Sequence, residues 1–284
     1  MAAISDDLCS EFEGAARVAA DTGLDGLGVR HVGGTSIRDL SLDDVRGIRR
    51  IADAHGLAVS AVTSPFGRDL YLDADDGPAV ELLDRMIGYA GVLGAPFVRV
   101  FAPWIAGKDA LPEWWERPDL GGAMPELTER MTRYARMAER AGVTLMLELE
   151  GASYVGQVAE ARAVLEAVDS PALALCWDVC NGWWSGELPW EDGWPIARGL
   201  PIVDVQTKDV AAADDDPGRP TFRQVVLGDG DLPYDRILPA LLADGYDGWF
   251  TVERVYHPRR PESEPQLLAD VLADVRALRR LLDR

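Results

Sequence analysis

Short apolar runs alternate along the chain with longer amphipathic segments. The short runs are rich in Val, Ile, Leu and Phe and predict β-strands, whereas the longer segments are rich in Ala, Leu, Arg and Glu and predict helices. The predicted strands are Ala2–Ser5, Asp25–Arg30, Leu57–Thr63, Phe97–Ala102, Thr144–Glu150, Leu173–Asp178, Ile202–Lys208 and Gly248–Val255. The predicted helices are Asp6–Thr22, Leu42–His55, Ala79–Leu93, Gly122–Ala141, Val155–Val168, a weak one at Trp190–Arg198, Tyr234–Ala243 and Glu264–Leu282.

The ends of the helices carry typical capping residues. A glycine follows several helices and precedes the next strand, where glycine commonly adopts the left-handed conformation that ends a helix. These glycines are Gly23, Gly56, Gly142 and Gly245. Ser41 and Asp43 stand where the N-cap of the second helix is expected.

Eight β/α alternations predict an α/β fold, a (β/α)8 TIM barrel formed as a single domain over residues 1–284. An open doubly wound sheet is the alternative, but no Gly-rich phosphate-binding motif follows any predicted strand. The polar segment Ala211–Arg223 is predicted to be a loop.

Composition narrows the range of partners. The net charge is −20, which opposes binding to nucleic acid or to anionic membranes because both need a cationic surface. Three cysteines cannot form a disulfide framework, and no apolar run approaches the ~18 residues that span a bilayer. The N-terminus lacks the pattern of a signal peptide, so we expect a cytoplasmic protein.

Polar residues stand near the ends of four consecutive predicted strands. Along Ile202–Lys208, side chains alternate between two faces, and one face carries only Asp204, Gln206 and Lys208. The fifth, sixth and eighth strands carry the carboxylates Glu148, Asp178 and Glu253. Parallel barrel strands are normally apolar on both faces, and catalytic groups of a TIM barrel lie at the carboxyl ends of its strands.

The combination of oxygen donors predicts a metal site. Buried carboxylates repel one another unless a cation neutralises them. Three carboxylates and one amide oxygen suit Mn²⁺ or Mg²⁺. Internal salt bridges from Arg99 and Lys208 to the glutamates are the alternative interpretation.

Several stretches, taken in order, resemble a known family. They are Gly142–Glu148 (GVTLMLE), Leu175–Asp178 (LCWD), Gln206–Asp209 (QTKD), Leu227–Asp231 (LGDGD) and Gly245–Glu253 (GYDGWFTVE). The chain thereby resembles the xylose-isomerase-like barrels known as sugar phosphate isomerases/epimerases, which include ketose 3-epimerases and inosose dehydratases. The resemblance implies that Glu148, Asp178, Gln206 and Glu253 bind one divalent metal. It also implies that Glu148 and Glu253 form the catalytic acid/base pair.

The chain departs from the family pattern at three positions. Gln206, Asn181 and Glu150 stand where the family often has histidine. The neutral, hard oxygen of Gln206 favours Mn²⁺, with Mg²⁺ or Co²⁺ as alternatives, over Zn²⁺. The departures leave the exact reaction open.

Further residues near the strand ends are predicted to contact substrate. They are Lys208, Glu150, Asn181, Arg99, His31 and Trp104. Arg99 either orients substrate or pairs with Glu150, and His31 is either a proton carrier or a surface-loop residue. His257 is a weaker candidate for the mouth. Most tryptophans follow the fourth and sixth strands, where they either stack on a sugar or pack the loops together.

The sequence thus predicts an isomerase or epimerase acting on a ketose or keto-cyclitol. Its mechanism would be removal of the proton α to a metal-bound carbonyl, through an enediolate. A metal-dependent lyase or dehydratase acting on a keto sugar, keto-glycoside or inosose is the alternative. The expected partners are a small carbohydrate and further copies of the chain, or else a separate small subunit. An endonuclease IV-type phosphodiesterase is disfavoured by three histidines and the charge of −20, and a non-catalytic barrel remains the third possibility.

Overall fold

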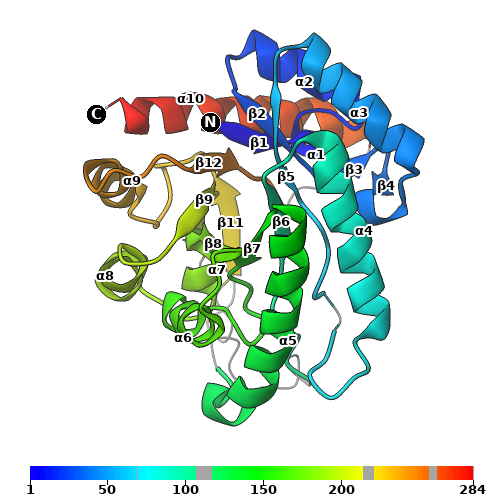
Figure 1. Cartoon of the computed structure of the whole chain (residues 1–284). Helices are drawn as coiled ribbons and strands as arrows, with labels where there is room; N and C mark the ends of the chain where they lie inside the picture. The colour runs from blue at the N-terminus through cyan, green and yellow to red at the C-terminus, as the bar shows by residue number, and fades with distance from the viewer. Residues whose placement is uncertain (69, 107–116, 214–220, 256–260, 284) are drawn as a thin grey trace.

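The structure, a computed structural model, describes all residues except 69, 107–116, 214–220, 256–260 and 284. Within this part of the chain, eight parallel strands close into a barrel in the order β1–β12–β9–β8–β7–β6–β5–β2. The helices lie around the outside of these strands (Figure 1). The predicted (β/α)8 TIM barrel is therefore confirmed, and the open doubly wound sheet is wrong because β1 pairs with both β2 and β12.

All eight predicted strands are present; β8 has its predicted bounds and the others are slightly shorter than their predicted ranges. The barrel strands are β1 (Ala2–Ile4), β2 (Gly26–Val29), β5 (Ala58–Val62), β6 (Phe97–Val100), β7 (Thr144–Glu148), β8 (Leu173–Asp178), β9 (Ile202–Thr207) and β12 (Trp249–Val252). They read as apolar runs because one face packs inside the barrel and the other packs against helices. Every residue of β8 is buried.

The helices largely follow the predicted ranges. They are α1 (Ser5–Leu8), α2 (Phe12–Asp21), α3 (Leu42–Ala54), α4 (Gly77–Leu93), α5 (Leu120–Ala141), α6 (Val158–Val168), α7 (Val179–Trp184), α8 (Trp194–Ala197), α9 (Tyr234–Ala243) and α10 (Glu264–Leu282). Short 3-10 turns form η1 (Ile37–Asp39) and η4 (Pro261–Ser263), and a π turn forms η3 (Pro189–Gly193).

The predicted caps are confirmed except at Asp43, which lies in the first turn of α3 and is not its cap. Ser41 is the N-cap: it accepts a hydrogen bond from the Asp44 backbone and completes a capping box with that residue. The four predicted glycines after helices all have positive φ, between 68° and 85°. They end their helices in the conformation that costs glycine least.

Three predictions about local structure are wrong. The first helix is divided, because Cys9 is extended and separates α1 from α2. Contacts with residues far away in the sequence stabilise this break. The Ser10 backbone N–H donates to Glu264, and the Gly33 N–H donates to the Ser10 carbonyl. The predicted helix Val155–Val168 begins only at Val158.

The segment Ala211–Arg223 is also not a simple loop. It contributes to an antiparallel hairpin of β10 (Asp209–Ala213) and β11 (Thr221–Val225), while residues 214–220 lie outside the described part. A second small hairpin joins β3 (His31–Val32) and β4 (Thr35–Ser36).

The main core lies between the strands and the helices. On α4, Leu83, Met86 and Ala90 are buried at helical spacing. Each fully buried large side chain of this kind contributes roughly 1.5–3 kcal/mol. Inside the barrel, Met146 and Cys176 form a separate small cluster with Ala61. No helix in the described ranges is long and apolar enough to cross a membrane.

Candidate active site

Two carboxylates stand directly above the apolar layer inside the barrel. Glu148 ends β7 two residues after Met146, and Asp178 ends β8 two residues after Cys176. Because strand side chains alternate, each carboxylate points to the same inner face as the residue two positions before it. Met146 and Cys176 belong to the inner cluster, so Glu148 and Asp178 face the barrel interior near its carboxyl end.

The other two predicted ligands lie at the same end of the barrel. Asp178 is the register partner of Gln206 on β9, and Gln206 is the partner of Thr251 on β12. Glu253 follows two residues after Thr251, and its backbone N–H bonds to the Thr207 carbonyl. Gln206 and Glu253 are both buried. The structure therefore brings all four predicted ligands to one end of the barrel.

Lys208 connects two of these carboxylates. Its Nζ donates to Asp178 Oδ2 and, at 2.7 Å, to Glu253 Oε2. The remaining oxygen of Glu253 accepts a hydrogen bond from Arg30 Nη1 at 3.0 Å. The remaining oxygen of Asp178 accepts a hydrogen bond from the Asn181 backbone N–H. This bond caps the N-terminus of α7. The predicted substrate contact Lys208 is thus an internal cation of the site.

Glu148 is held by a second set of donors. Arg99 Nη1 lies 3.2 Å and Gln206 Nε2 lies 3.0 Å from Glu148 Oε2. Asn181 Nδ2 lies 3.5 Å from Oε1 and donates more closely, at 2.7 Å, to the Leu149 carbonyl. The interpretation that Arg99 pairs with Glu150 is wrong, because Arg99 forms its ion pair with Glu148.

Burial and neighbouring charge separate the pKa values of the two glutamates. Burial raises the pKa of Glu148 to about 7, and the Arg99 charge only partly opposes this. Burial acts in the same direction on Glu253, but Lys208 and Arg30 outweigh it and lower the pKa of Glu253 to about 2. Near neutral pH Glu253 is therefore ionised, whereas Glu148 lies close to its own pKa.

Asp204 forms a deeper layer of the same inner face. It stands two residues before Gln206 and is buried. Thr251 Oγ1 donates to Asp204 Oδ1 at 2.7 Å. Burial raises the pKa of Asp204 to about 8, so the protonated carboxyl is the stable form below that pH. The polar row of β9 therefore faces the barrel interior along its length.

Comparison with known proteins agrees with this architecture. A model of the family described as xylose isomerase-like TIM barrel matches residues 16–280. The chain belongs to the xylose isomerase-like TIM barrel family. No match is found among curated protein sequences.

Solved structures show the same fold at low sequence identity. A xylose isomerase-like TIM barrel protein from Mycobacterium smegmatis, in complex with magnesium, is 21% identical with a TM-score of 0.70; the match covers 95% of this chain and 89% of that one. The probable 3-DHS dehydratase AsbF from Bacillus anthracis is 15% identical with a TM-score of 0.74, covering 98% of both chains. The 3-keto-D-glucoside 4-epimerase YcjR from E. coli is 19% identical with a TM-score of 0.67, covering 93% and 94%.

The donors of this xylose isomerase-like barrel fit a divalent cation. Gln206 Oε1 is buried and, among the described residues, has no hydrogen-bond partner, which is unusual for a buried amide oxygen. With Glu148, Asp178 and Glu253 it completes a set of hard oxygen donors. In the conformation seen here, however, no three His, Cys, Asp or Glu side chains of the described residues are grouped as a metal site. The carboxylates bond instead to Lys208 and to arginines.

Three predicted substrate residues lie apart from this network. His31 is in the β3–β4 hairpin, 42% exposed, with Nδ1 3.6 Å from Asp6 Oδ2. Glu150 accepts the Ala152 backbone N–H at 3.0 Å and so shapes the turn after β7. Trp104 forms backbone bridges and an edge-on ring contact with Phe101. Contact of these residues with substrate stays a prediction.

The tryptophans after the sixth strand pack against other aromatic rings. The ring centres of Trp183 and Trp184 each lie 4.5 Å from the ring centre of Phe222 on β11. Trp194 stacks between Trp177 and Trp190 at 6.2 Å from each. These contacts favour the interpretation that the rings join loops together. Trp114, Trp115 and His257 lie outside the described residues.

One important site residue was not singled out as a partner of the glutamates. Arg30 directly follows β2. It donates hydrogen bonds to Asp6 and Asp7 as well as to Glu253. Its position directly after a barrel strand is the sequence signal that could have identified it. Asp6 and Asp7 lie directly after β1, so they carry the same signal.

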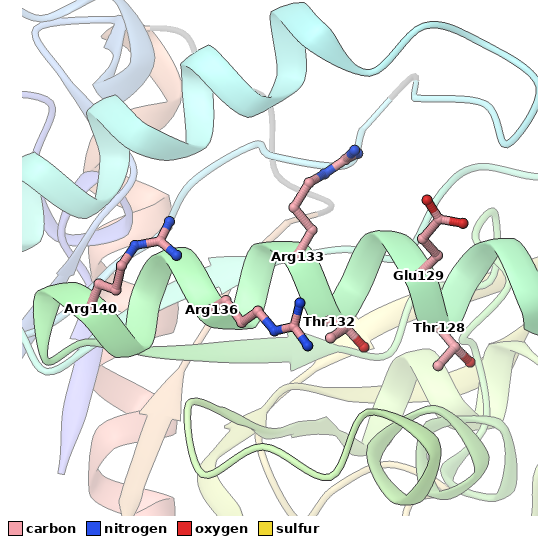
Figure 2. A pocket seen from close by; sticks show the side chains of 6 residues that line it. All are labelled: Thr128, Glu129, Thr132, Arg133, Arg136 and Arg140. Atoms are coloured by element: carbon pink, nitrogen blue, oxygen red, sulfur yellow. The ribbon is translucent and has the colours of Figure 1, made fainter.

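A pocket of about 480 Å³ lies elsewhere, on α5. Figure 2 shows that its lining side chains all project from this helix. They are Thr128, Glu129, Thr132, Arg133, Arg136 and Arg140. Arg133 is ion-paired with Asp76. None of the predicted site residues lines this pocket.

Proposed function

We propose that the chain is an isomerase or epimerase that moves a proton next to the carbonyl of a ketose or keto-cyclitol. One observation carries this proposal. The two buried carboxyl groups of Glu148 and Glu253 lie at the same end of the barrel but come from strands that are not neighbours. In the barrel order, β8 and β9 separate β7 from β12. A carbon atom held between the two groups can lose a proton on one face and regain it on the other.

The chain's own cations fix the two carboxyl groups before substrate arrives. Arg99 donates to Glu148 and also to the Ser64 carbonyl at 3.0 Å, and its guanidinium lies 4.7 Å from the Phe101 ring centre. Arg30 holds Glu253 from the other side of the site. Such fixed positions reduce the reorganisation required during proton transfer.

A divalent cation would be held by Glu148, Asp178, Gln206 and Glu253, and Gln206 would contribute Oε1, which has no hydrogen-bond partner within the described ranges. We expect Mn²⁺ first, with Mg²⁺ or Co²⁺ as alternatives, because all four donors are oxygen atoms. When bound, the cation supplies Lewis acidity toward a carbonyl oxygen.

The proton path uses residues of the chain. Either Glu148 or Glu253 accepts the α-proton, and the other carboxyl group returns a proton to the opposite face in an epimerisation. Return to the neighbouring carbon gives isomerisation instead. The Lys208 ammonium can donate to a substrate oxygen once it leaves its carboxylate partners.

The test is a panel of keto sugars and keto-cyclitols incubated with the protein and Mn²⁺, Mg²⁺ or Co²⁺, with products separated by chromatography and identified by NMR. Interconversion of one member of the panel, lost in Glu148→Gln and Glu253→Gln, is the expected result. Exposed Glu166→Gln is the matched control and should retain activity. A panel with no turnover under any of these metals would contradict the proposal.

Dehydration is the second candidate. It is favoured by the absence of imidazole around Glu148 among the described residues, where amides occupy positions 181 and 206. An elimination needs one carboxyl group as base and another as acid toward the leaving hydroxyl, which the same pair can supply. Formation of a conjugated enone, seen as a new ultraviolet absorbance, distinguishes this reaction from epimerisation.

A further inference from the structure

Lys208 occupies a position at which two candidate metal ligands meet. It follows the last residue of β9 and is buried. Its Nζ donates to both Asp178 and Glu253. Its backbone is fixed by Tyr234, whose hydroxyl donates to the Lys208 carbonyl at 2.9 Å. The ammonium is therefore held between two strands at the height of the candidate metal site.

The carboxylate oxygens next to this ammonium are already engaged. Asp178 uses Oδ1 for the Asn181 backbone and Oδ2 for Lys208. Glu253 uses Oε1 for Arg30 and Oε2 for Lys208. Each of these oxygens keeps a second lone pair, but a divalent cation that binds both residues lies close to the Lys208 ammonium between them. Two cations at this separation in a buried site repel each other strongly.

We propose that the Lys208 ammonium and the divalent cation compete for Asp178 and Glu253, so that metal binding displaces Lys208 toward the substrate. This inference rests on the proposed function, since it concerns the same four ligands. The ammonium neutralises the buried carboxylates when the cation is removed, and the released ammonium becomes a hydrogen-bond donor for a substrate oxygen.

Lys208 is the cation best suited to this exchange. Arg30 is anchored by Asp6 and Asp7, and Arg99 by the Ser64 carbonyl, all outside the candidate ligand set. Lys208 Nζ donates to two candidate ligands at once. A lysine ammonium also sits on a flexible four-carbon stem, whereas an arginine fork loses several fixed hydrogen bonds when it moves.

The sequence makes this displacement directly observable. The chain contains only two lysines, Lys108 and Lys208. Protein labelled with carbon-13 at the lysine ε position therefore gives two methylene signals, and the variant Lys108→Arg identifies that of Lys208. The labelled protein is treated with a chelator, dialysed and titrated with Mg²⁺, which is diamagnetic. The Lys208 signal should shift as Mg²⁺ binds.

Calorimetry with Mg²⁺ and Mn²⁺ provides the second measurement. Lys208→Met removes the competing charge, so it should bind metal about tenfold more tightly or better than wild type. Lys208→Arg keeps the charge and should not show this gain. Should Lys208→Met fail to fold, the NMR titration of the unmutated protein still decides the question.

The outcomes separate this inference from the proposed function. A stationary Lys208 signal during calorimetrically confirmed Mg²⁺ binding, or equal affinities for wild type and Lys208→Met, overturns the competition and leaves the metal-dependent function standing. If Lys208→Met binds metal and the wild type does not, the competition is supported and the metal dependence of the natural chain is overturned. Failure of both proteins to bind metal overturns both.

Discussion

Glu187 should make the stability of the protein depend on pH through a single side chain. It is buried between α7 and η3, and its Oε2 accepts the Val158 backbone N–H at 2.8 Å, at the start of α6. Within the described residues, Oε1 has no hydrogen-bond partner. Burial raises the pKa of Glu187 from 4.5 to about 7, although the bond from Val158 lowers it. The perturbation is Glu187→Gln, which cannot ionise.

The direction of the pH effect follows from the pKa of Glu187 being higher in the folded protein than in the unfolded chain. The unfolded chain releases the Glu187 proton near pH 4.5, whereas the folded protein keeps it until about pH 7. The wild type therefore loses stability as the pH rises from 4.5 to 7, and the loss is complete above 7. The difference between the two pKa values corresponds to about 3 kcal/mol. Glu187→Gln should gain about this much relative to wild type between pH 4.5 and pH 8.

The assay is urea denaturation followed by tryptophan fluorescence, at pH 4.5 and at pH 8, on wild type and variant. Glu166→Gln is the matched control, because it makes the same change at a side chain that is 62% exposed, and its effect on the unfolding free energy should stay below about 0.5 kcal/mol. The reasoning is refuted if the stability difference between Glu187→Gln and wild type is equal at pH 4.5 and pH 8.

Three further substitutions test other parts of the structure. Asp209→Ala removes a carboxylate that accepts four backbone N–H groups around the loop before α9, so the unfolding free energy should fall by about 3 kcal/mol in urea denaturation; a change below about 0.5 kcal/mol would contradict this. Arg99→Met leaves Glu148 without its ion-pair partner and should cost about 3 kcal/mol or more in the same assay, and unchanged stability would be inconsistent with the buried pair. Tyr134→Phe loses a 2.6 Å hydrogen bond to Asp76 and should cost about 1–2 kcal/mol; a thermal midpoint equal to wild type would show that the bond contributes nothing.

Local patterns were enough to predict the barrel, because each strand is defined by its own apolar run. The exceptions depend on contacts between distant segments. The break after α1 is held by Glu264 and Gly33, which no local pattern around Cys9 reveals. The short helix α7 begins at Val179, directly after Asp178, whose side chain both caps the helix and faces the site. Its sequence is too short to show helical periodicity.

The site was predictable as a set of strand ends but not as a network of bonds. Regular spacing placed Glu148, Asp178 and Gln206 at similar height; the register pairs Asp178 with Gln206 but Glu148 with Cys176, two residues before Asp178. Which cation pairs with which carboxylate depends on side-chain reach across the barrel. The sequence therefore left open both the bridge from Lys208 and the contact of Arg30 with Glu253.

Solvent deuterium exchange tests the central claim most directly, because it reports proton abstraction whatever the final product. Wild-type protein with Mn²⁺ is incubated in D₂O with a keto sugar or keto-cyclitol, and loss of the α-proton signal is followed by NMR. We predict exchange at the carbon next to the carbonyl, abolished in Glu148→Gln or Glu253→Gln and retained in Glu166→Gln. Absence of exchange with any tested substrate, or equal exchange in wild type and both glutamine variants at positions 148 and 253, would contradict the account.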